Sequence, residues 1–393
     1  MLRRPRSGRL EARSTHGLSS AADPRYVRRP VGRRVGRPDS GHGSMRLFRH
    51  YNEVPVEARG AVVAIGNFDG VHRGHHAVIA ATARHARELG TSHAVVTFEP
   101  HPREFFAPDA PSFRLTPFRI KVRQLEAIGL DHLFVLHFDR ELANKSAEAF
   151  VVEVLSEGLE VAHVVVGYDF VFGHQRRGNA ELLAELGRLR GFGVTTLPPV
   201  SGEPGEIYSS TRIRQHLSAG SPLAAGALLG RPWEIEGRVE QGDRRGRTLG
   251  FPTANLPIAG YLQPALGVYA VKAGIDEGRG TIWRDGVANL GRRPTVGGTR
   301  VQLEVHLFDF AGDLYGRHLR VALIDFLRPE KKFDGLPALQ AQIAEDSRQA
   351  RHALAGYAGP APGGVPSPPA REQAGDGRPL YQRALSPWRD SDS

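Results

Sequence analysis

The chain has 393 residues, of which 40% are hydrophobic and 24% charged, and a formal net charge of +10. This length is enough for two domains, and the composition is that of a globular protein. The absence of cysteine excludes disulfides and thiolate catalysis, and no apolar run approaches the ~18 residues that a membrane-spanning helix requires.

The positive charge is concentrated in an N-terminal extension, residues 1–44. The extension contains eleven arginines and three acidic residues, a net charge of +8 that leaves +2 for the other 349 residues. Its Arg, Gly, Pro and Ser content, without an apolar period, predicts a disordered segment that is not a secretory signal. We expect the functional chain to start at Met45. The alternatives are a transit peptide and an arm that binds nucleic acid.

Strands and helices alternate from residue 45 to about 225. A short apolar run at 61–66 predicts a buried strand, and a helix is expected at about 75–89. This alternation predicts a parallel sheet with helices on both faces and ligands beyond the carboxyl ends of the strands. The other strands are expected at 93–98, 132–138 and 161–167, and the other helices at 117–128, 146–157 and 180–191.

The pattern changes at about residue 230. A short helix is expected from Ser221, as its N-cap, to Gly230. Closely spaced strands then predict an antiparallel barrel within 230–354, and the Pro- and Gly-rich tail from 358 is expected to be disordered. The strands are expected at 233–240, 267–275, 281–290, 301–308 and 317–328, and a final helix at about 335–354 with Leu336, Leu339, Ile343 and Ala350 on its packed side.

The string GNFDGVHRGH, residues 66–75, follows the first strand and opens the first helix. Its glycines let the backbone approach a ligand, and a helix N-terminus favours phosphate. His72 and His75 can face the same ligand and stabilise charge that develops on the α-phosphate of a nucleotide. A metal site that includes His76 is the alternative, although no further ligand spacing supports it.

A second string, SSTRIR at residues 209–214, also opens a helix. Serine or threonine at a helix start is commonly a cap, which explains one hydroxyl. The cap does not explain Arg212 and Arg214. Arginines at this position suit the β- and γ-phosphates that leave as pyrophosphate.

A third string, GDRRGRTLGFPTAN at residues 242–255, is not a P-loop, because its glycine spacing differs and Arg247 replaces lysine. Gly246 and Gly250 permit a tight loop that cradles phosphate. Thr253 and Asn255 offer oxygen ligands for Mg²⁺. The alternative is an ordinary turn.

The expected strand at 301–308 alternates between an apolar face and a face with Gln302, Glu304 and His306. Glu304 could be the general base that takes a proton from a hydroxyl attacking a γ-phosphate. The alternative is a solvated polar face.

The first two strings resemble the nucleotidylyltransferase superfamily. With TFEPHPREFF (97–106), RLTPFRIK (114–121) and VGYDFVFG (166–173), they resemble one branch, the bacterial bifunctional riboflavin kinase/FMN adenylyltransferases, or FAD synthetases. GFPTAN, VANLGRRPT (287–295), LEVHLFDFAGDLYG (303–316) and FLRPEKKF (326–333) resemble the riboflavin-kinase module of that family. The resemblance covers residues 45–354 and implies a Rossmann-like nucleotidylyltransferase domain at 45–225, followed by a riboflavin-kinase-like barrel with a terminal helix at 230–354.

The resemblance implies that the chain makes FAD by phosphorylating riboflavin to FMN and adenylylating FMN, with ATP, riboflavin and FMN as substrates and Mg²⁺ as cofactor. Glu304, His72, His75 and Arg214 would be catalytic. The residues implied to bind ATP and phosphate are Gly66, Asn67, Phe68, Asp69, Gly74, Ser210, Thr211, Gly246, Arg247, Gly250, Thr253 and Asn255. The residues implied to bind the flavin are Pro100, His101, Pro102, Asp169 and Phe170. The Mg²⁺ ion would be bound by Thr253 and Asn255.

Two other functions are alternatives to this one. An adenylyltransferase for another acceptor, such as phosphopantetheine or nicotinate mononucleotide, would carry a barrel that only binds. A nucleic-acid-binding protein would use the basic extension, but the rest of the chain is nearly neutral. We therefore expect a cytoplasmic enzyme of small molecules, with neither a nucleic-acid nor a membrane partner.

Overall fold

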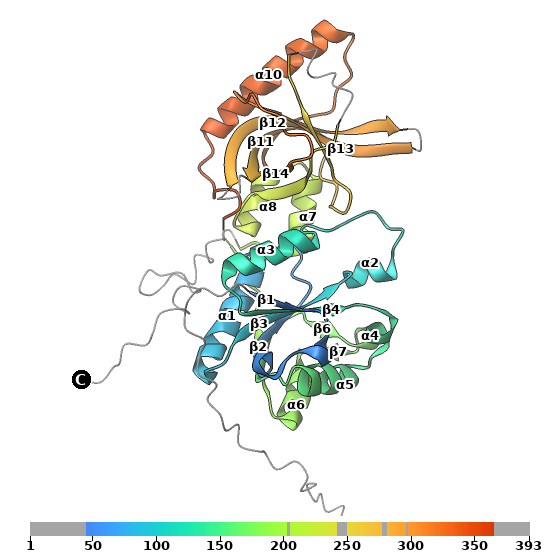
Figure 1. Ribbon diagram of the computed structural model, residues 1–393, viewed down its shortest axis with the longest axis vertical. Helices are drawn as coiled ribbons and strands as arrows, with labels where there is room; N and C mark the ends of the chain where they lie inside the picture. The colour runs from blue at the N-terminus through green and yellow to red at the C-terminus, as the bar shows by residue number, and fades with distance from the viewer. Residues whose placement is uncertain (1–44, 203–204, 242–249, 277–280, 296–297, 365–393) are drawn as a thin grey trace, which may run out of the picture. The chain divides into compact units, whose positions relative to one another are not determined.

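The computed structural model describes residues 45–202, 205–241, 250–276, 281–295 and 298–364 (Figure 1). The expectations for residues 1–44, for Gly246 and Arg247, and for the tail beyond Gly364 lie outside these residues.

The first half of the described chain contains a parallel sheet of six strands, in the order β1-β4-β3-β2-β5-β8. The predicted parallel sheet is therefore confirmed. The edge strands β1 and β8 were not predicted, because one is short and the other is only half-buried. The strands are β1 (Arg46–Phe48), β2 (Val62–Ile65), β3 (His93–Glu99), β4 (His132–His137), β5 (His163–Gly167) and β8 (Gly193–Leu197).

Helices cover both faces of this sheet, as expected. Alternate strand residues face opposite cores: Ala64 and Val95 pack with Ile79 of α1, whereas Val63 and Val96 pack with Val154 on the other side. The predicted helix at 146–157 is a short α5 that continues as a π-helix. The helices are α1 (Arg73–Leu89), α2 (Pro102–Phe106), α3 (Phe118–Ile128), α4 (Arg140–Asn144), α5 (Ala147–Ala149), the π-helix (Phe150–Gly158) and α6 (Ala180–Arg190), and a small hairpin pairs β6 (Val171–Phe172) with β7 (Gly178–Asn179).

Two short helices, α7 (Ser210–Ser218) and α8 (Pro222–Leu229), lead to the second half. Gly230 ends α8 in the left-handed conformation (φ 78°), as predicted. Ser221 occupies the N-cap position, but its side chain makes no capping hydrogen bond.

The second half is an antiparallel sheet in the order β10-β13-β12-β11-β14-β9. The sheet curls (Figure 1), and an isolated bridge between Glu240 and Asn255 connects the ends of its two edge strands. The predicted antiparallel barrel is confirmed. The strands are β9 (Trp233–Arg238), β10 (Ala254–Pro257), β11 (Gly267–Asp276), β12 (Thr281–Thr295), β13 (Gly298–Leu307) and β14 (His318–Pro329).

The final helix, α10 (Leu336–Ala355), packs on the outside of this sheet through Ala350 and Leu354. The prediction that Leu336 lies on the packed side is wrong, since this side chain is 63% exposed. The first turn of α10 contributes nothing to the core, and the buried stripe begins at Asp346, which pairs with Arg328. The described chain continues to Gly364, and the backbone N–H of Gly363 donates to Glu234.

A continuous apolar core joins the barrel to the helices before it. It includes Ile213 and Leu217 of α7, Leu229 of α8, and Trp233 of β9, together with Leu115 from the loop before α3. In the part of the chain that the structure describes, no helix has the length and apolarity to span a membrane.

Candidate active sites

The loop between β2 and α1, residues 66–72, has a strained backbone. Phe68 (φ 48°), Gly70 (φ 93°) and Val71 (φ 43°) all adopt positive φ, which is costly for residues with a Cβ and is concentrated at functional sites. The Phe68 side chain is 2% exposed in the core, so only its backbone can face a ligand. Asn67 is exposed, and Gly66 donates to Val96 O at 3.1 Å.

His72 and His75 stack at the N-terminus of α1, with their ring centroids 3.6 Å apart. Nδ1 of each ring accepts the backbone N–H of the other residue at 3.3 Å, an arrangement that caps the helix. In its neutral form each ring therefore carries its proton on Nε2 and can donate it to a ligand. Gly74 permits this packing, because a Cβ there would lie 3.1 Å from the His72 ring and 3.2 Å from Tyr208 O.

Burial keeps these imidazoles neutral. It lowers the pKa of His72 and of His76 to about 3, and that of His75 well below its ordinary value. Near neutral pH the two stacked rings are therefore hydrogen-bond donors without a net charge. They do not repel each other, and they can donate to an anion without first taking up a proton.

The stability of the protein should depend on these buried histidines. Their pKa is lower in the folded than in the unfolded state, so their neutral form stabilises the fold. This contribution to the free energy of unfolding is fully present above pH ~6.5. It falls by up to about 1.4 kcal/mol per pH unit for each histidine as pH decreases toward 3. We predict that His76→Phe reduces the slope of unfolding free energy against pH between 6.5 and 4, as measured by urea denaturation. His137→Phe, at an exposed position, is the control. Equal slopes in the two variants would contradict the prediction.

Asp69 organises the loop and does not offer its carboxylate to a phosphate. The carboxylate is 3% exposed and accepts the backbone N–H of Leu115 (3.0 Å) and of Thr116 (2.9 Å). It also pairs with Arg214 Nη2 at 2.5 Å, while Arg214 Nε donates to Phe113 O. Asp69 therefore fixes Arg214 in place.

The N-terminus of α7 is tied to the same loop. Ser210 Oγ donates to Asp69 O at 2.7 Å, and Ser209 caps the helix by accepting the backbone N–H of Arg212. Thr211 is exposed in the first helical turn and can reach a ligand. Arg212 is also exposed and pairs with Glu206, so of the two arginines in this string it is Arg214 that contacts the loop.

The segment after β3 contains Pro100, His101 and Pro102. His101 is buried and caps α2 by accepting the backbone N–H of Arg103, and burial lowers its pKa to about 4. The preceding Glu99 accepts two hydrogen bonds from Arg114, at 2.8 and 2.7 Å, and pairs with Lys121 at 3.2 Å.

Lys121, on α3, is 1% exposed, and a buried lysine was not predicted there. Burial lowers its pKa. The only signal for it in the sequence was its position in the string RLTPFRIK.

The segment after β5 contains Asp169 and Phe170. Asp169 is exposed, whereas Phe170 stacks on Phe172 at 5.3 Å and packs against the core. Since β3, β2 and β5 are neighbours in the parallel sheet, the loop with His72 lies between the segments with His101 and Asp169.

A second set of polar residues meets across three strands of the barrel. Glu304 on β13 is directly opposite Asn255 on β10 and Asn289 on β12. Its carboxylate pairs with Arg293. Asn255 is 4% exposed, and its Oδ1 has no hydrogen-bond partner among the described atoms. A buried carbonyl oxygen without a partner is costly, unless it serves as a ligand to a cation or a water molecule.

The described part of the string 242–255 begins at Gly250 and ends in strand β10. Gly250 has a left-handed backbone (φ 85°), and Thr253 is half-buried next to the strand. His306, whose role was not foreseen, hydrogen-bonds Pro252 O at 2.9 Å through Nδ1 and so fixes this segment against β13.

The alternative of a metal site at His72, His75 and His76 is not supported. Within the described ranges, no group of three His, Cys, Asp or Glu side chains is arranged to hold a metal ion.

Known proteins are similar to both halves of the chain. A family model for FAD synthetase matches residues 54–212, and one for riboflavin kinase matches residues 229–354. The bifunctional riboflavin kinase/FMN adenylyltransferase of Escherichia coli (strain K12) is 44% identical over 310 residues, which are 78% of this chain and 97% of the relative. The protein of that name from Bacillus subtilis (strain 168) is 38% identical over 312 residues, 78% of this chain and 96% of the relative.

The fold also has a solved counterpart. A crystal structure from Streptococcus pneumoniae, described as a macrolide-efflux protein, superposes with a TM-score of 0.69 and 31% identity over 78% of this chain and 98% of that one. The two domain matches on one chain, and relatives matched over nearly their whole length, show that this chain belongs to the family of bifunctional riboflavin kinases/FMN adenylyltransferases.

Proposed function

We propose that the two reactions of this enzyme are divided between the two halves of the chain. Residues 230–354 would phosphorylate riboflavin to FMN, and residues 45–225 would adenylylate FMN to FAD. The main observation behind this assignment is that the two candidate sites lie on different domains. The neutral, stacked imidazoles of His72 and His75 are at the start of α1, whereas Glu304 is in the barrel.

In the adenylylation, a phosphate oxygen of FMN attacks the α-phosphorus of ATP, and the bond to the bridging oxygen of pyrophosphate breaks. His72 and His75 would donate Nε2–H to the α-phosphate oxygens, where negative charge develops. Arg214, Thr211 and the backbone of residues 66–70 would hold the phosphates that leave. Because Asp69 fixes Arg214, its guanidinium needs little rearrangement during the reaction.

The flavin of FMN would lie against the segments that flank this loop. Pro100, His101 and Pro102 follow β3, and Asp169 and Phe170 follow β5, on either side of β2. The rigid cap formed by His101 and the exposed carboxylate of Asp169 support this assignment.

In the phosphorylation, the 5′-hydroxyl of riboflavin attacks the γ-phosphorus of ATP, and ADP leaves. Glu304 would accept the hydroxyl proton. Arg293 pairs with Glu304, and its guanidinium could also bind a phosphate of ATP.

Mg²⁺ suits the oxygens near Glu304. Asn255 Oδ1 is buried and has no hydrogen-bond partner among the residues that the structure describes, and Thr253 offers a hydroxyl two residues earlier. These two residues would hold the ion together with phosphate oxygens of ATP. When bound, the ion neutralises charge on the phosphates. We place the enzyme in the cytoplasm, where ATP is abundant, with small molecules as its partners.

Two substrate feeds test the assignment. The purified protein is given either riboflavin or FMN, with ATP and Mg²⁺, and the flavins are separated by chromatography. A variant of the barrel site should form no FMN from riboflavin but should still convert FMN to FAD. A variant of the α/β site should form FMN from riboflavin but should not convert FMN to FAD. If single-site variants such as Glu304→Gln and His72→Asn each lost both activities while folded, the division would be wrong.

Replacing Asn255 by leucine tests the cation site. We predict that Asn255→Leu raises the Mg²⁺ concentration needed for half-maximal riboflavin phosphorylation about tenfold, because one oxygen ligand is lost. FMN adenylylation should be unchanged. Gln302→Leu, which removes an amide from the polar face of the neighbouring strand, is the control. An unchanged Mg²⁺ requirement in Asn255→Leu would rule out this ligand.

A further inference from the structure

A buried arginine at the start of the barrel contacts the loop of the other site. Arg231 lies between α8 and β9 and is 3% exposed. Its Nη2 donates to Gly70 O at 2.6 Å and its Nη1 to Val71 O at 3.0 Å. These carbonyls directly precede His72, although Val71 and Arg231 are 160 residues apart in the sequence.

A neighbouring residue makes a second connection of the same kind. Trp233, at the start of β9, donates Nε1–H to Leu115 O at 2.8 Å. The backbone N–H of Leu115 in turn donates to Asp69, which fixes Arg214. The first residues of the barrel therefore contact the loop that precedes His72 directly and, through Leu115, the carboxylate that fixes Arg214.

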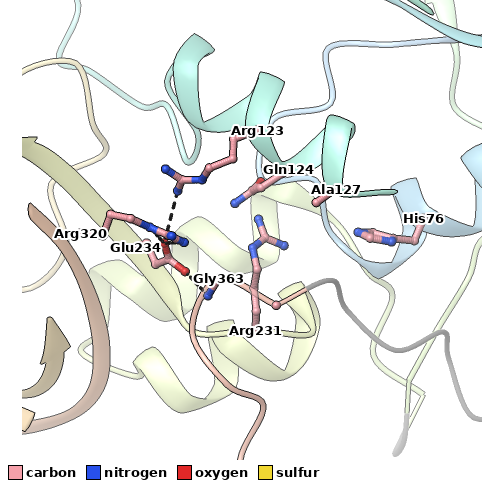
Figure 2. Close-up of a pocket in the computed structure, with 9 residues that line it drawn as sticks. His76, Arg123, Gln124, Ala127, Arg231, Glu234, Arg320 and Gly363 are labelled. Atoms are coloured by element: carbon pink, nitrogen blue, oxygen red, sulfur yellow. Dashed lines mark hydrogen bonds and ion pairs between the residues drawn. The ribbon is translucent and has the colours of Figure 1, made fainter. Parts of the chain in front are cut away.

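Arg231 contacts the strained part of the loop. Gly70 and Val71 both adopt positive φ, a conformation that persists only when surrounding groups hold it. A buried guanidinium gives strong, directional hydrogen bonds to carbonyls, since its charge is poorly screened there. Figure 2 shows the Arg231 guanidinium in a pocket near Gln124 of α3, with Glu234 on one side and His76 of α1 on the other.

We infer that Arg231 is a positioning residue for FMN adenylylation. It holds the carbonyls of Gly70 and Val71, so that the rings of His72 and His75 present Nε2–H in the right direction. The segment that opens the kinase barrel thus completes the site of the other reaction. This inference rests on the proposed assignment of adenylylation to His72 and His75.

The charge of Arg231 acts in the same direction as its hydrogen bonds. It disfavours protonation of His72, as does Arg214, whereas Asp69 favours it. His75 is additionally influenced by His72, His76 and Lys121. The guanidinium therefore helps to keep both rings neutral, which preserves the capping hydrogen bonds of Nδ1.

The experiment compares two arginines of the same pocket. Arg231→Met removes the contact with the loop, whereas Arg123→Met removes a guanidinium that pairs with Glu234 and Glu236 and touches no residue of the loop. Arg231→Lys keeps the charge but cannot donate to both carbonyls with the geometry of arginine. Each full-length variant is assayed with FMN and, separately, with riboflavin.

For Arg231→Met we expect kcat of FMN adenylylation to fall on the order of 10- to 100-fold, the effect of a misplaced catalytic group. KM for FMN and ATP should change less than about threefold, and riboflavin phosphorylation should be retained, because the interaction acts on the geometry of the transition state. Arg231→Lys should recover part of the loss, and Arg123→Met should remain within about threefold of the unmodified protein.

Several results would overturn the inference. It fails if Arg231→Met keeps adenylylation within about threefold of Arg123→Met, or if the change lies in KM alone. If Arg231→Met loses both activities, Arg231→Lys decides: a selective loss of adenylylation supports the inference, and full activity overturns it. Normal adenylylation by His72→Asn would instead refute the proposed site. If His72→Asn is inactive while Arg231→Met is active, only the role of Arg231 is refuted.

Discussion

Replacing Glu304 by glutamine is expected to abolish riboflavin phosphorylation and to leave the conversion of FMN to FAD intact. Glutamine has nearly the shape of glutamate but cannot accept the hydroxyl proton. Loss of a general base typically lowers the rate by about 10² to 10⁴. FMN adenylylation should be unaffected, because the residues proposed for it lie in the parallel α/β half.

The location of Glu304 makes this a clean substitution. It lies on the central part of β13, between Asn255 and Asn289 of the adjacent strands, and its ion pair with Arg293 is partly exposed. Loss of such a pair costs less than about 1 kcal/mol, so the barrel should remain folded.

A matched control lies two residues beyond the end of β13. Asp309→Asn also removes a carboxylate paired with an arginine, Arg351, but at an exposed site away from Asn255. Both variants should convert FMN to FAD at the normal rate, and only Glu304→Gln should fail to make FMN from riboflavin. Phosphorylation by Glu304→Gln within tenfold of Asp309→Asn would show that another group is the base.

The sequence was sufficient for the elements whose pattern is local. The apolar runs at 61–66 and 93–98 became β2 and β3, and the strand at 301–308 placed Glu304 on the face opposite Leu303 and Val305, as expected. The His72–His75 spacing also predicted two rings at one helix start, which the structure shows stacked.

The features that were missed depend on contacts between distant segments. The sequence 254–257 has no strand pattern of its own, and it becomes β10 because it pairs with β13. The interactions of Asp69 with Leu115, Thr116 and Arg214 were also not predicted, because these partners are at least 46 residues away in the sequence. No periodicity can show such partners.

The final helix illustrates the same limit in packing. An amphipathic pattern identified the helix and included Ala350 correctly, but Leu336 is 63% exposed and does not belong to the apolar cluster that contains Ala350 and Leu354. Which turns of an amphipathic helix are buried depends on the elements packed against it, and the helix sequence alone does not contain this information.

Family membership also decides between FAD synthesis and the alternative of an adenylyltransferase for another acceptor. A family model for riboflavin kinase matches the barrel from residue 229 to 354, so a barrel that only binds is no longer needed to explain the chain. The model for FAD synthetase at 54–212 favours FMN over phosphopantetheine or nicotinate mononucleotide as the acceptor.

The reciprocal substitution, in the other half of the chain, is His72→Asn. We choose asparagine over alanine because His72 caps α1 with Nδ1, and asparagine is a good N-cap residue. The variant should therefore keep the helix start, while losing the Nε2–H that we propose to stabilise the α-phosphate. Removing one such donor typically lowers kcat by about 10² to 10³.

With riboflavin and ATP, His72→Asn should accumulate FMN and form FAD only slowly, the reverse of the result expected for Glu304→Gln. The control is His85→Asn, which changes a histidine of the same helix that also stacks on another histidine, His163, but lies at the far end of α1. Chromatography of the flavins over time separates the two outcomes.

If His72→Asn made FAD as fast as His85→Asn, the stacked pair would be structural, and the adenylyl transfer would depend on Arg214 and the backbone of the loop. If it also failed to make FMN while folded, the two reactions would share a site, and the division of labour would be refuted.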